Sequence, residues 1–167
     1  GDDKILLVPV NGVISNRSED RLFTEKPGMV QEVVSHLNKA AEDPSIKAVI
    51  LKVNSPGGTV TASDILYHEL KSFREKTGKK IVVLMMDIAT SGGYYVSMPA
   101  DYIMAHPTTV TGSIGVIFIR PNIAKILDKL GVNVGATKSG ENKDMGSPFR
   151  QPSPEEDRLF QKYTDEM

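Results

Sequence analysis

The stretch Ile81-Val82-Val83-Leu84-Met85-Met86, followed by Ala89-Thr90-Ser91-Gly92-Gly93-Tyr94-Tyr95, decides the fold. The six apolar residues indicate a buried strand, and a serine before two glycines indicates a sharp turn into a helix. Such a corner holds the Ser91 oxygen clear of the backbone, beside free N–H groups of the next helix, as a nucleophile requires. Serine is also a preferred helix N-cap, so the corner alone favours a capping role for Ser91.

A second corner of the same kind lies earlier in the chain. The apolar strand expected over residues 48–53 leads into Asn54-Ser55-Pro56-Gly57-Gly58-Thr59, and the helix after it has apolar residues on one face from Ala62 to Phe73. Strands that alternate with helices predict an α/β fold with a largely parallel sheet. Two similar corners favour stacked βα units over a Rossmann order, and neither contains a dinucleotide or P-loop glycine motif.

Further elements follow from hydrophobic spacing and from glycine and proline positions. The polar segment 15–25 is expected to be a mobile loop. Helices are expected from Pro27-Gly28 to about residue 42, over 122–130 and over 155–167, and a short helix from Ser91 to about Met98. Strands are expected over residues 4–10, 102–105, 110–117 and 132–137.

Composition limits the kind of protein. The chain has 167 residues, 40% of them hydrophobic and 25% charged, which fits one globular domain over residues 1–167. A net charge of −1 gives no basic footprint for nucleic acid, so no nucleic-acid partner is expected. The absence of cysteine excludes a cysteine nucleophile, cysteine-ligated zinc and disulfides.

Both ends of the sequence look cut. Gly1-Asp2-Asp3 leads at once into a strand, and the last helix reaches Met167 with no glycine or proline stop. The expectation is a soluble fragment of a longer protein that lacks an N-terminal membrane anchor and some C-terminal residues.

A serine nucleophile needs an oxyanion hole and a base, and the sequence offers candidates for both. Gly57 and Gly58 follow a buried strand, where bare backbone N–H groups could form an oxyanion hole; the alternative is an ordinary Pro-Gly-Gly turn. A base must activate Ser91. The histidine candidates are His36 and His68, which fall in the middle of expected helices, and His106, which precedes Pro107. They lack the spacing of metal ligands, so a surface or capping role is favoured over a catalytic one for each. The remaining candidates are lysines of the polar loop Lys138-Ser139-Gly140-Glu141-Asn142-Lys143-Asp144.

Five motifs in order resemble the signal peptide peptidase A family, the protease IV group of Ser-Lys peptidases. They cover nearly the whole chain and read Pro56-Gly57-Gly58, Ala89 through Ser97, Pro99-Ala100-Asp101, Thr111-Gly112-Ser113-Ile114-Gly115-Val116, and Lys138-Ser139-Gly140 with Lys143-Asp144. At Met86 and Thr90, which lie near Ser91, this sequence differs from the residues that are common in the family. A Clp-type Ser-His-Asp protease is disfavoured, because Val116-Ile117-Phe118 stands where such an enzyme has its histidine.

The resemblance implies a Clp/crotonase-like spiral of stacked ββα units. It implies that Ser91 is the nucleophile and that the base is Lys143, with Lys138 as the alternative. It places the oxyanion hole at Gly58, with Gly92 as a further donor, beside the Gly57 candidate that the residues themselves offer. Ser113 either lines the cleft and hydrogen-bonds the lysine or has only a turn role. No metal or cofactor is implied.

The expected function is that of a serine endopeptidase that degrades cleaved signal peptides and other membrane-associated or unfolded peptides. The resemblance also implies a membrane-anchored parent, with its catalytic domain outside the cytoplasm and assembled into a homo-oligomeric ring. Three alternatives stay open at this point. They are a dedicated protease of the stomatin-operon or phage-head type, a crotonase-like acyl-CoA enzyme, and a non-catalytic scaffold.

Overall fold

The computed structural model describes residues 2–17, 19–21 and 24–167. The chain divides into two compact units, Gly1–Gly115 and Val116–Met167. The prediction of a single domain stays a prediction. The helices and strands of the first unit, in chain order, are β1 (Lys4–Asn11), β2 (Glu19–Arg21), β3 (Thr24–Lys26), α1 (Met29–Glu42), β4 (Ile46–Ser55), α2 (Val60–Thr77), β5 (Lys80–Thr90), α3 (Gly92–Tyr95), β6 (Tyr102–Ala105) and β7 (Val110–Gly112).

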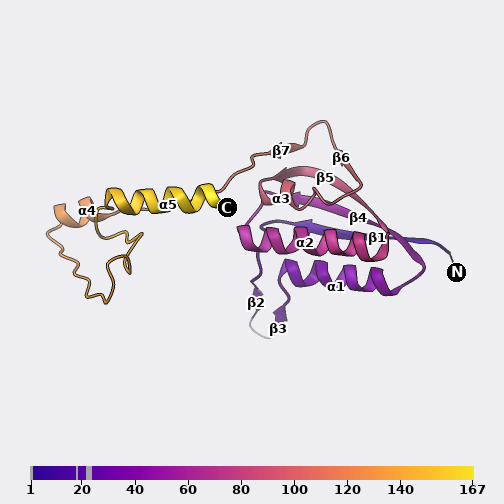
Figure 1. Cartoon of the computed structure of the whole chain (residues 1–167), viewed down its shortest axis with the longest axis horizontal. Helices are drawn as coiled ribbons and strands as arrows, with labels where there is room; N and C mark the ends of the chain where they lie inside the picture. Colours follow the sequence, from indigo (N-terminus) through magenta and orange to yellow (C-terminus); the bar gives the residue numbers. More distant parts are fainter. Residues whose placement is uncertain (1, 18, 22–23) are drawn as a thin grey trace. The chain divides into compact units, whose positions relative to one another are not determined.

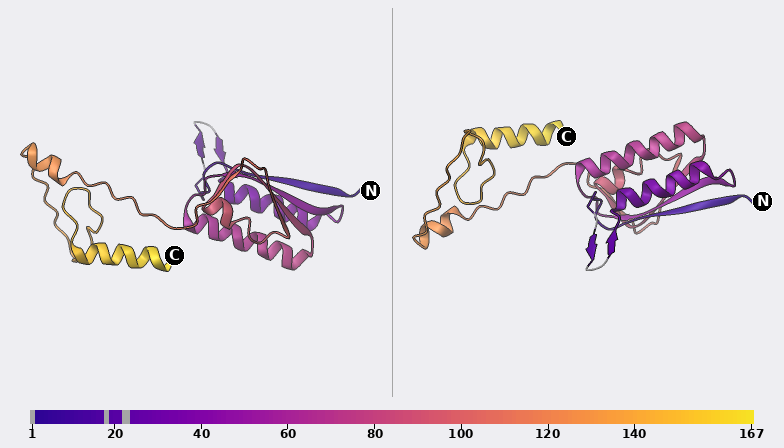
Figure 2. Two further views of the ribbon diagram at one scale, coloured as in Figure 1. Left: turned by 90° about the horizontal axis from the view of Figure 1, so that it is seen from above. Right: turned by 90° about the horizontal axis from the view of Figure 1, so that it is seen from below.

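The main sheet is parallel and runs in the order β1-β4-β5-β6, with β7 paired to the end of β5. Because this order advances in one direction, right-handed crossovers place the connecting helices on the same face of the sheet. α1 and α2 do lie together on one face (Figures 1 and 2). The strand order therefore confirms stacked βα units in place of a Rossmann order, in which the winding reverses.

The core lies between this face and the two helices. Along β4, Val49, Leu51 and Val53 are fully buried and alternate with half-buried residues, as expected for a strand with one covered face. Most of the apolar helix positions expected from the sequence point into the same core. Buried on the helices are Val30, Val33, Leu37 and Ala40 of α1 and Ala62, Leu66, Leu70 and Phe73 of α2.

The turn that follows α3 is tied back to the start of β5. The Asp101 carboxylate accepts hydrogen bonds from the Lys80 ammonium at 2.8 Å and from the Ile81 N–H at 2.9 Å. The Asp101 N–H in turn donates to the Ile81 carbonyl at 2.9 Å. These bonds fix the point at which the chain leaves α3 for β6.

Three expectations from the sequence were wrong or only partly right. The segment expected to be a loop forms an antiparallel hairpin of β2 and β3, although Ser18, Leu22 and Phe23 lie outside the described residues. The strand expected over 110–117 ends at Gly112, because Ser113 has a positive φ of 54°, which breaks an extended chain. The short helix after Ser91 ends at Tyr95, and turns continue to Pro99.

The second unit contains two helices, α4 (Ala124–Lys129) and α5 (Pro154–Glu166), joined by turns. Both helices were expected from the sequence. The strand expected over 132–137 is not formed: no strand occurs in the described residues 116–167, so this apolar segment has no partner within its unit. The Arg120 guanidinium stacks over the Phe160 ring at 4.3 Å and fastens the start of the unit to α5.

Candidate active site

Ser91 occupies a strained corner between β5 and α3. Its backbone has φ 52° and ψ −121°, a region that residues other than glycine rarely adopt. Such strain costs about 1–3 kcal/mol and persists only where the surroundings impose it. Here the Ser91 N–H donates to the Gly112 carbonyl at 2.8 Å, and the Ser91 carbonyl accepts from the Tyr95 N–H at 2.9 Å.

The capping interpretation of Ser91 is wrong for its side chain. Ser91 stands at the N-cap position of α3, but its hydroxyl makes no capping hydrogen bond. The residue therefore has the strained geometry of a nucleophile corner without using its oxygen for the helix. The hydroxyl is left for another partner.

Gly57 brings the second corner against the first. A Cβ on Gly57 would lie 2.7 Å from the Gly92 nitrogen, 2.9 Å from Ser91 Cβ and 3.1 Å from Ser91 Oγ. Gly57 also has φ +96°, so glycine is required here both by backbone conformation and by space. The loops that follow the adjacent strands β4 and β5 thus meet at the Ser91 hydroxyl.

A register shift between β4 and β5 makes this meeting possible. Val53 pairs with Met85, but Ser55 pairs with Ala89, so β5 carries extra residues at this point. The Asn54 side-chain oxygen accepts a hydrogen bond from the Ile88 N–H at 3.1 Å and fills the irregular stretch. Such bulges commonly re-aim a strand end beside a functional site.

The backbone donors around Ser91 are not equivalent. The Gly57 N–H donates to Ser55 Oγ at 3.1 Å, so this candidate for the oxyanion hole is already occupied. Gly58 pairs with Ile14 in a parallel bridge made by the Gly57 carbonyl and the Thr59 N–H, which turns the N–H of Gly58 away from Ile14. An oxyanion role for Gly58 and Gly92 stays a prediction.

Two buried serines near this corner were not singled out from the sequence. Ser55 Oγ donates to the Gly12 carbonyl at 2.6 Å and accepts from Gly57, which ties the β1 turn to the glycine loop. Ser63 Oγ is buried without a hydrogen-bond partner among the described residues, and a Cβ on Gly92 would collide with it. A serine that ends an apolar strand was the only sequence signal for Ser55.

Ser113 lies next to the residue whose carbonyl holds the Ser91 N–H. It directly follows Gly112, whose carbonyl accepts from Ser91, and it is exposed with φ 54°. The strained, exposed position fits either a cleft residue or a turn residue. Its contact with a lysine stays a prediction.

The histidines have local environments of their own. His68 Nε2 lies 3.5 Å from the Asp64 carboxylate, one turn away on α2, and His106 Nδ1 lies 2.8 Å from Thr108 Oγ. His36 lies on α1. No hydrogen bond joins a histidine to Ser91 in the parts of the chain that the structure describes.

The two candidate lysines belong to the second unit and differ in their partners. Lys138 Nζ donates to Asp144 Oδ1 at 2.7 Å and to the Glu141 carbonyl at 2.8 Å. Lys143 is exposed, and its backbone N–H, bonded to the Gly140 carbonyl at 3.2 Å, is its one hydrogen-bonded group among the described residues. Ser91 belongs to the first unit, and its pairing with either lysine stays a prediction.

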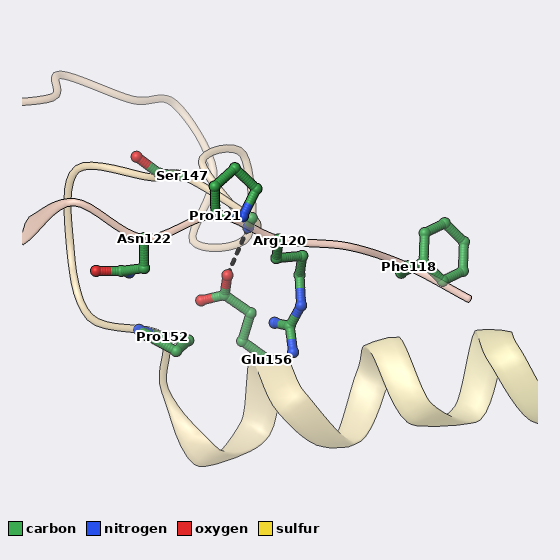
Figure 3. A pocket seen from close by; sticks show the side chains of 8 residues that line it. Phe118, Arg120, Pro121, Asn122, Ser147, Pro152 and Glu156 are labelled. Atoms are coloured by element: carbon green, nitrogen blue, oxygen red, sulfur yellow. Dashed lines mark hydrogen bonds between the residues drawn. The ribbon is translucent and has the colours of Figure 1, made fainter.

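A pocket in the second unit lies beside this lysine loop. It is lined by Phe118, Arg120, Pro121, Asn122, Gly146, Ser147, Pro152 and Glu156. Figure 3 shows the Glu156 carboxylate turned toward the backbone near Ser147, where it accepts a hydrogen bond from the Gly146 N–H. Asn122 Nδ2 donates to the Arg150 carbonyl at 2.6 Å, and the Arg120 guanidinium pairs with Asp157 at 2.9 Å, so these polar groups of the pocket already have partners.

Within residues 2–17, 19–21 and 24–167, no group of three or more histidine, aspartate or glutamate side chains is arranged to hold a metal ion. Over the same residues, no helix has the length and apolar character needed to cross a membrane.

Comparison with known proteins connects this geometry to a family. The model of Peptidase family S49 matches residues 73–167, which include Ser91 and both lysines, and that of Clp protease matches residues 23–111. A protein named signal peptide peptidase SppA from Enterococcus faecium is 41% identical over 96% of this chain and 46% of its own length. The chloroplastic serine protease SPPA of Arabidopsis thaliana is 36% identical over 97% of this chain and 24% of its own length.

A solved structure supports the fold. A membrane-bound stomatin-specific protease in complex with a substrate peptide superposes with a TM-score of 0.55 at 16% identity, covering 70% of this chain and 47% of that one. The chain spans less than half the length of these curated relatives. Its α/β fold is Clp-like, as expected, and the chain belongs to Peptidase family S49.

Proposed function

We propose that this chain is the catalytic part of a serine endopeptidase that uses a Ser-Lys dyad. The observation that carries the proposal is the strained Ser91 corner, where Gly57 lies against both the uncapped Ser91 hydroxyl and the Gly92 nitrogen. Strain of this kind gathers at reactive sites, and glycines leave the backbone open to a substrate. Membership of a peptidase family supports the same reading.

The proposed reaction has two halves. Neutral Lys143 Nζ takes the proton from Ser91 Oγ as this oxygen attacks a peptide carbonyl, and the Gly58 and Gly92 N–H groups stabilise the resulting oxyanion. The lysine then gives its proton to the departing amine, and the C–N bond breaks to leave an acyl-enzyme. Water, deprotonated by Lys143, attacks the ester, and the carboxylic acid and Ser91 are released. The cycle needs no metal or redox cofactor.

We further propose cleaved signal peptides and other membrane-associated peptides as substrates. The name of the Enterococcus faecium relative supports signal peptides, and the structural neighbour was captured with a peptide. We also propose a membrane-anchored parent with its catalytic domain outside the cytoplasm, and a ring of identical subunits in which Ser91 and Lys143 can come from different chains. We assign no stomatin-specific function to this chain, because 16% identity to that neighbour supports the fold alone.

The test compares wild type with Ser91→Ala, Lys143→Ala and Lys138→Ala in digests of casein and of a synthetic signal peptide. We expect Ser91→Ala and Lys143→Ala to be inactive and Lys138→Ala to retain cleavage at a reduced rate. Retained cleavage by Ser91→Ala would falsify the mechanism, and loss in Lys138→Ala alone would move the base to that residue. Sedimentation of each variant comes first, because the assembly states must match before activities are compared.

A further inference from the structure

The loop that carries the candidate lysines is fastened to a single arginine. Arg150 Nε and Nη2 donate to the two carboxylate oxygens of Asp144 at 2.8 and 3.0 Å, and Nη2 also reaches the Asp144 carbonyl at 3.1 Å. Two parallel N–H···O bonds fix both position and orientation, which one ammonium cannot do. Asp144 directly follows Lys143, so this contact fixes the backbone beside the proposed base.

Glu156 anchors the same arginine to a helix. Its buried carboxylate accepts from Arg150 Nη1 at 2.7 Å and from the Gly146 N–H, and its own N–H donates to the capping Ser153 Oγ at 3.1 Å. Figure 3 shows this carboxylate rising from the first turn of α5 toward the loop. The loop is therefore attached to α5 at both Asp144 and Gly146, through charged groups that satisfy one another.

Lys138 binds the same carboxylate as Arg150, that of Asp144. Its ammonium spans Asp144 Oδ1 and the Glu141 carbonyl, and so links the start of the loop to its middle. The hydrogen bonds from Arg150 and Lys138 hold the pKa of the Asp144 carboxyl well below its usual range. The Lys143 side chain has no such partner among the described residues, although both sides of its backbone are held.

Resting on the proposed Ser-Lys chemistry, we propose that Asp144, Arg150 and Glu156 are positioning residues for Lys143, and that Lys138 is a strut of this cluster. The cluster holds the backbone on which the long and flexible Lys143 side chain pivots. A base must reach its proton within hydrogen-bond distance, and a displacement of about 1 Å can cost about 10²-fold in rate. The cluster therefore acts on the rate of the chemical step through Lys143, without touching the substrate.

The variants Asp144→Asn and Arg150→Lys in the full chain test this inference. Arg150→Lys keeps the charge but loses the two-pronged contact. We expect each to lower kcat about 10²-fold per folded molecule with KM little changed, beyond any loss of stability that the broken hydrogen bonds cause. Because both act through one contact, their double variant should lose much less than the product of the two single losses. Asp157→Asn is the control, since it cuts the exposed Arg120–Asp157 pair of the same unit and should leave kcat unaltered.

The outcomes separate this inference from the proposed function. If Lys143→Ala retains full activity, the dyad itself fails. If Lys143→Ala is inactive while Asp144→Asn and Arg150→Lys match wild type, only the positioning role is overturned. The positioning role is also overturned if Asp144→Asn and Arg150→Lys lose no more kcat than they lose folded protein. It is overturned as well if Lys138→Met is inactive while Lys143→Met is active.

Discussion

At the scale of single residues, position 57 requires glycine both for its backbone conformation and for the space around it. Gly57→Ala must adopt φ +96° and place a methyl group 2.7 Å from the Gly92 nitrogen. We expect it to lower the free energy of unfolding by about 1–3 kcal/mol and to abolish peptide cleavage, because Ser91 has to move. Urea unfolding and digestion of casein measure the two effects.

Gly78→Ala is the matched control for this prediction. Gly78 also has a positive φ, +67°, but nothing lies within 4 Å of its missing Cβ. It should pay only the backbone cost of about 1–2 kcal/mol and keep the cleavage rate of the folded protein. Equal activities of the two variants would contradict the role given to the Gly57 approach.

The two buried serines near the corner should respond in opposite ways. Ser55→Ala removes a donor to Gly12 and an acceptor for Gly57, so we expect it to destabilise the fold by about 1–3 kcal/mol. Ser63→Ala removes a buried hydroxyl without a partner among the described residues and should be neutral or stabilising. Urea midpoints of both variants and wild type settle the order, and a Ser63→Ala protein less stable than Ser55→Ala would refute it.

At the scale of elements, the contact between the α3–β6 turn and the start of β5 depends on the ionisation of Asp101. Hydrogen bonds from Lys80 and then from the Ile81 N–H lower the pKa of this carboxyl in the folded state. A lowered folded-state pKa contributes stability above the unfolded value, near 4, that is lost as pH falls through the folded value. Wild type should therefore lose stability below about pH 4, and Asp101→Asn should lose less over the same range.

Urea unfolding at intervals from about pH 2 to pH 6 measures this difference. Asp3→Asn serves as the control, since Asp3 pairs with Lys47 at 3.6 Å with both side chains largely exposed and should leave the slope near that of wild type. A pH dependence of Asp101→Asn equal to that of wild type would exclude Asp101 as the group responsible.

Elements with strong local patterns were predictable from the sequence. The α1 and α2 segments bury one face each, and that burial leaves a helical period in the sequence that reveals element and face together. The β4 and β5 segments were recognised as continuous apolar runs, which reveal the strand but not its covered face. Strands depend on partners as well as on composition, so residues 132–137 look like a strand without forming one, and the hairpin of β2 and β3 escaped notice.

Only part of the candidate site could be predicted from the sequence. The Ser91 corner could be found from its neighbours in sequence, since strand, serine and glycines are contiguous. The role of Ser55, the bridge between Gly58 and Ile14, and the engagement of Lys138 depend on contacts between residues that no local pattern links. The choice between Lys138 and Lys143 rested on family spacing alone, and their different partners are visible only in three dimensions.

At the scale of the whole molecule, the core lies within the first unit. Every buried residue of the main cluster falls between Val8 and Val96. We expect residues 1–115 alone to fold with a cooperative transition and to lack peptidase activity, because Lys143 is absent. Circular dichroism during urea unfolding tests the first part and casein digestion the second. A broad transition without cooperativity, or cleavage by this fragment, would contradict the prediction.

The positive φ of Ser91 also bears on how such a chain evolves. Glycine adopts φ 52° freely, so Ser91→Gly should relieve the corner and yield a protein at least as stable as wild type. Under the proposed mechanism, selection for catalysis is what keeps a side chain here, against a steady advantage in fold stability for losing it. Lineages in which this fold has become an inactive subunit should drift toward glycine at the position, which makes the residue at position 91 a readable record of whether catalysis has been retained.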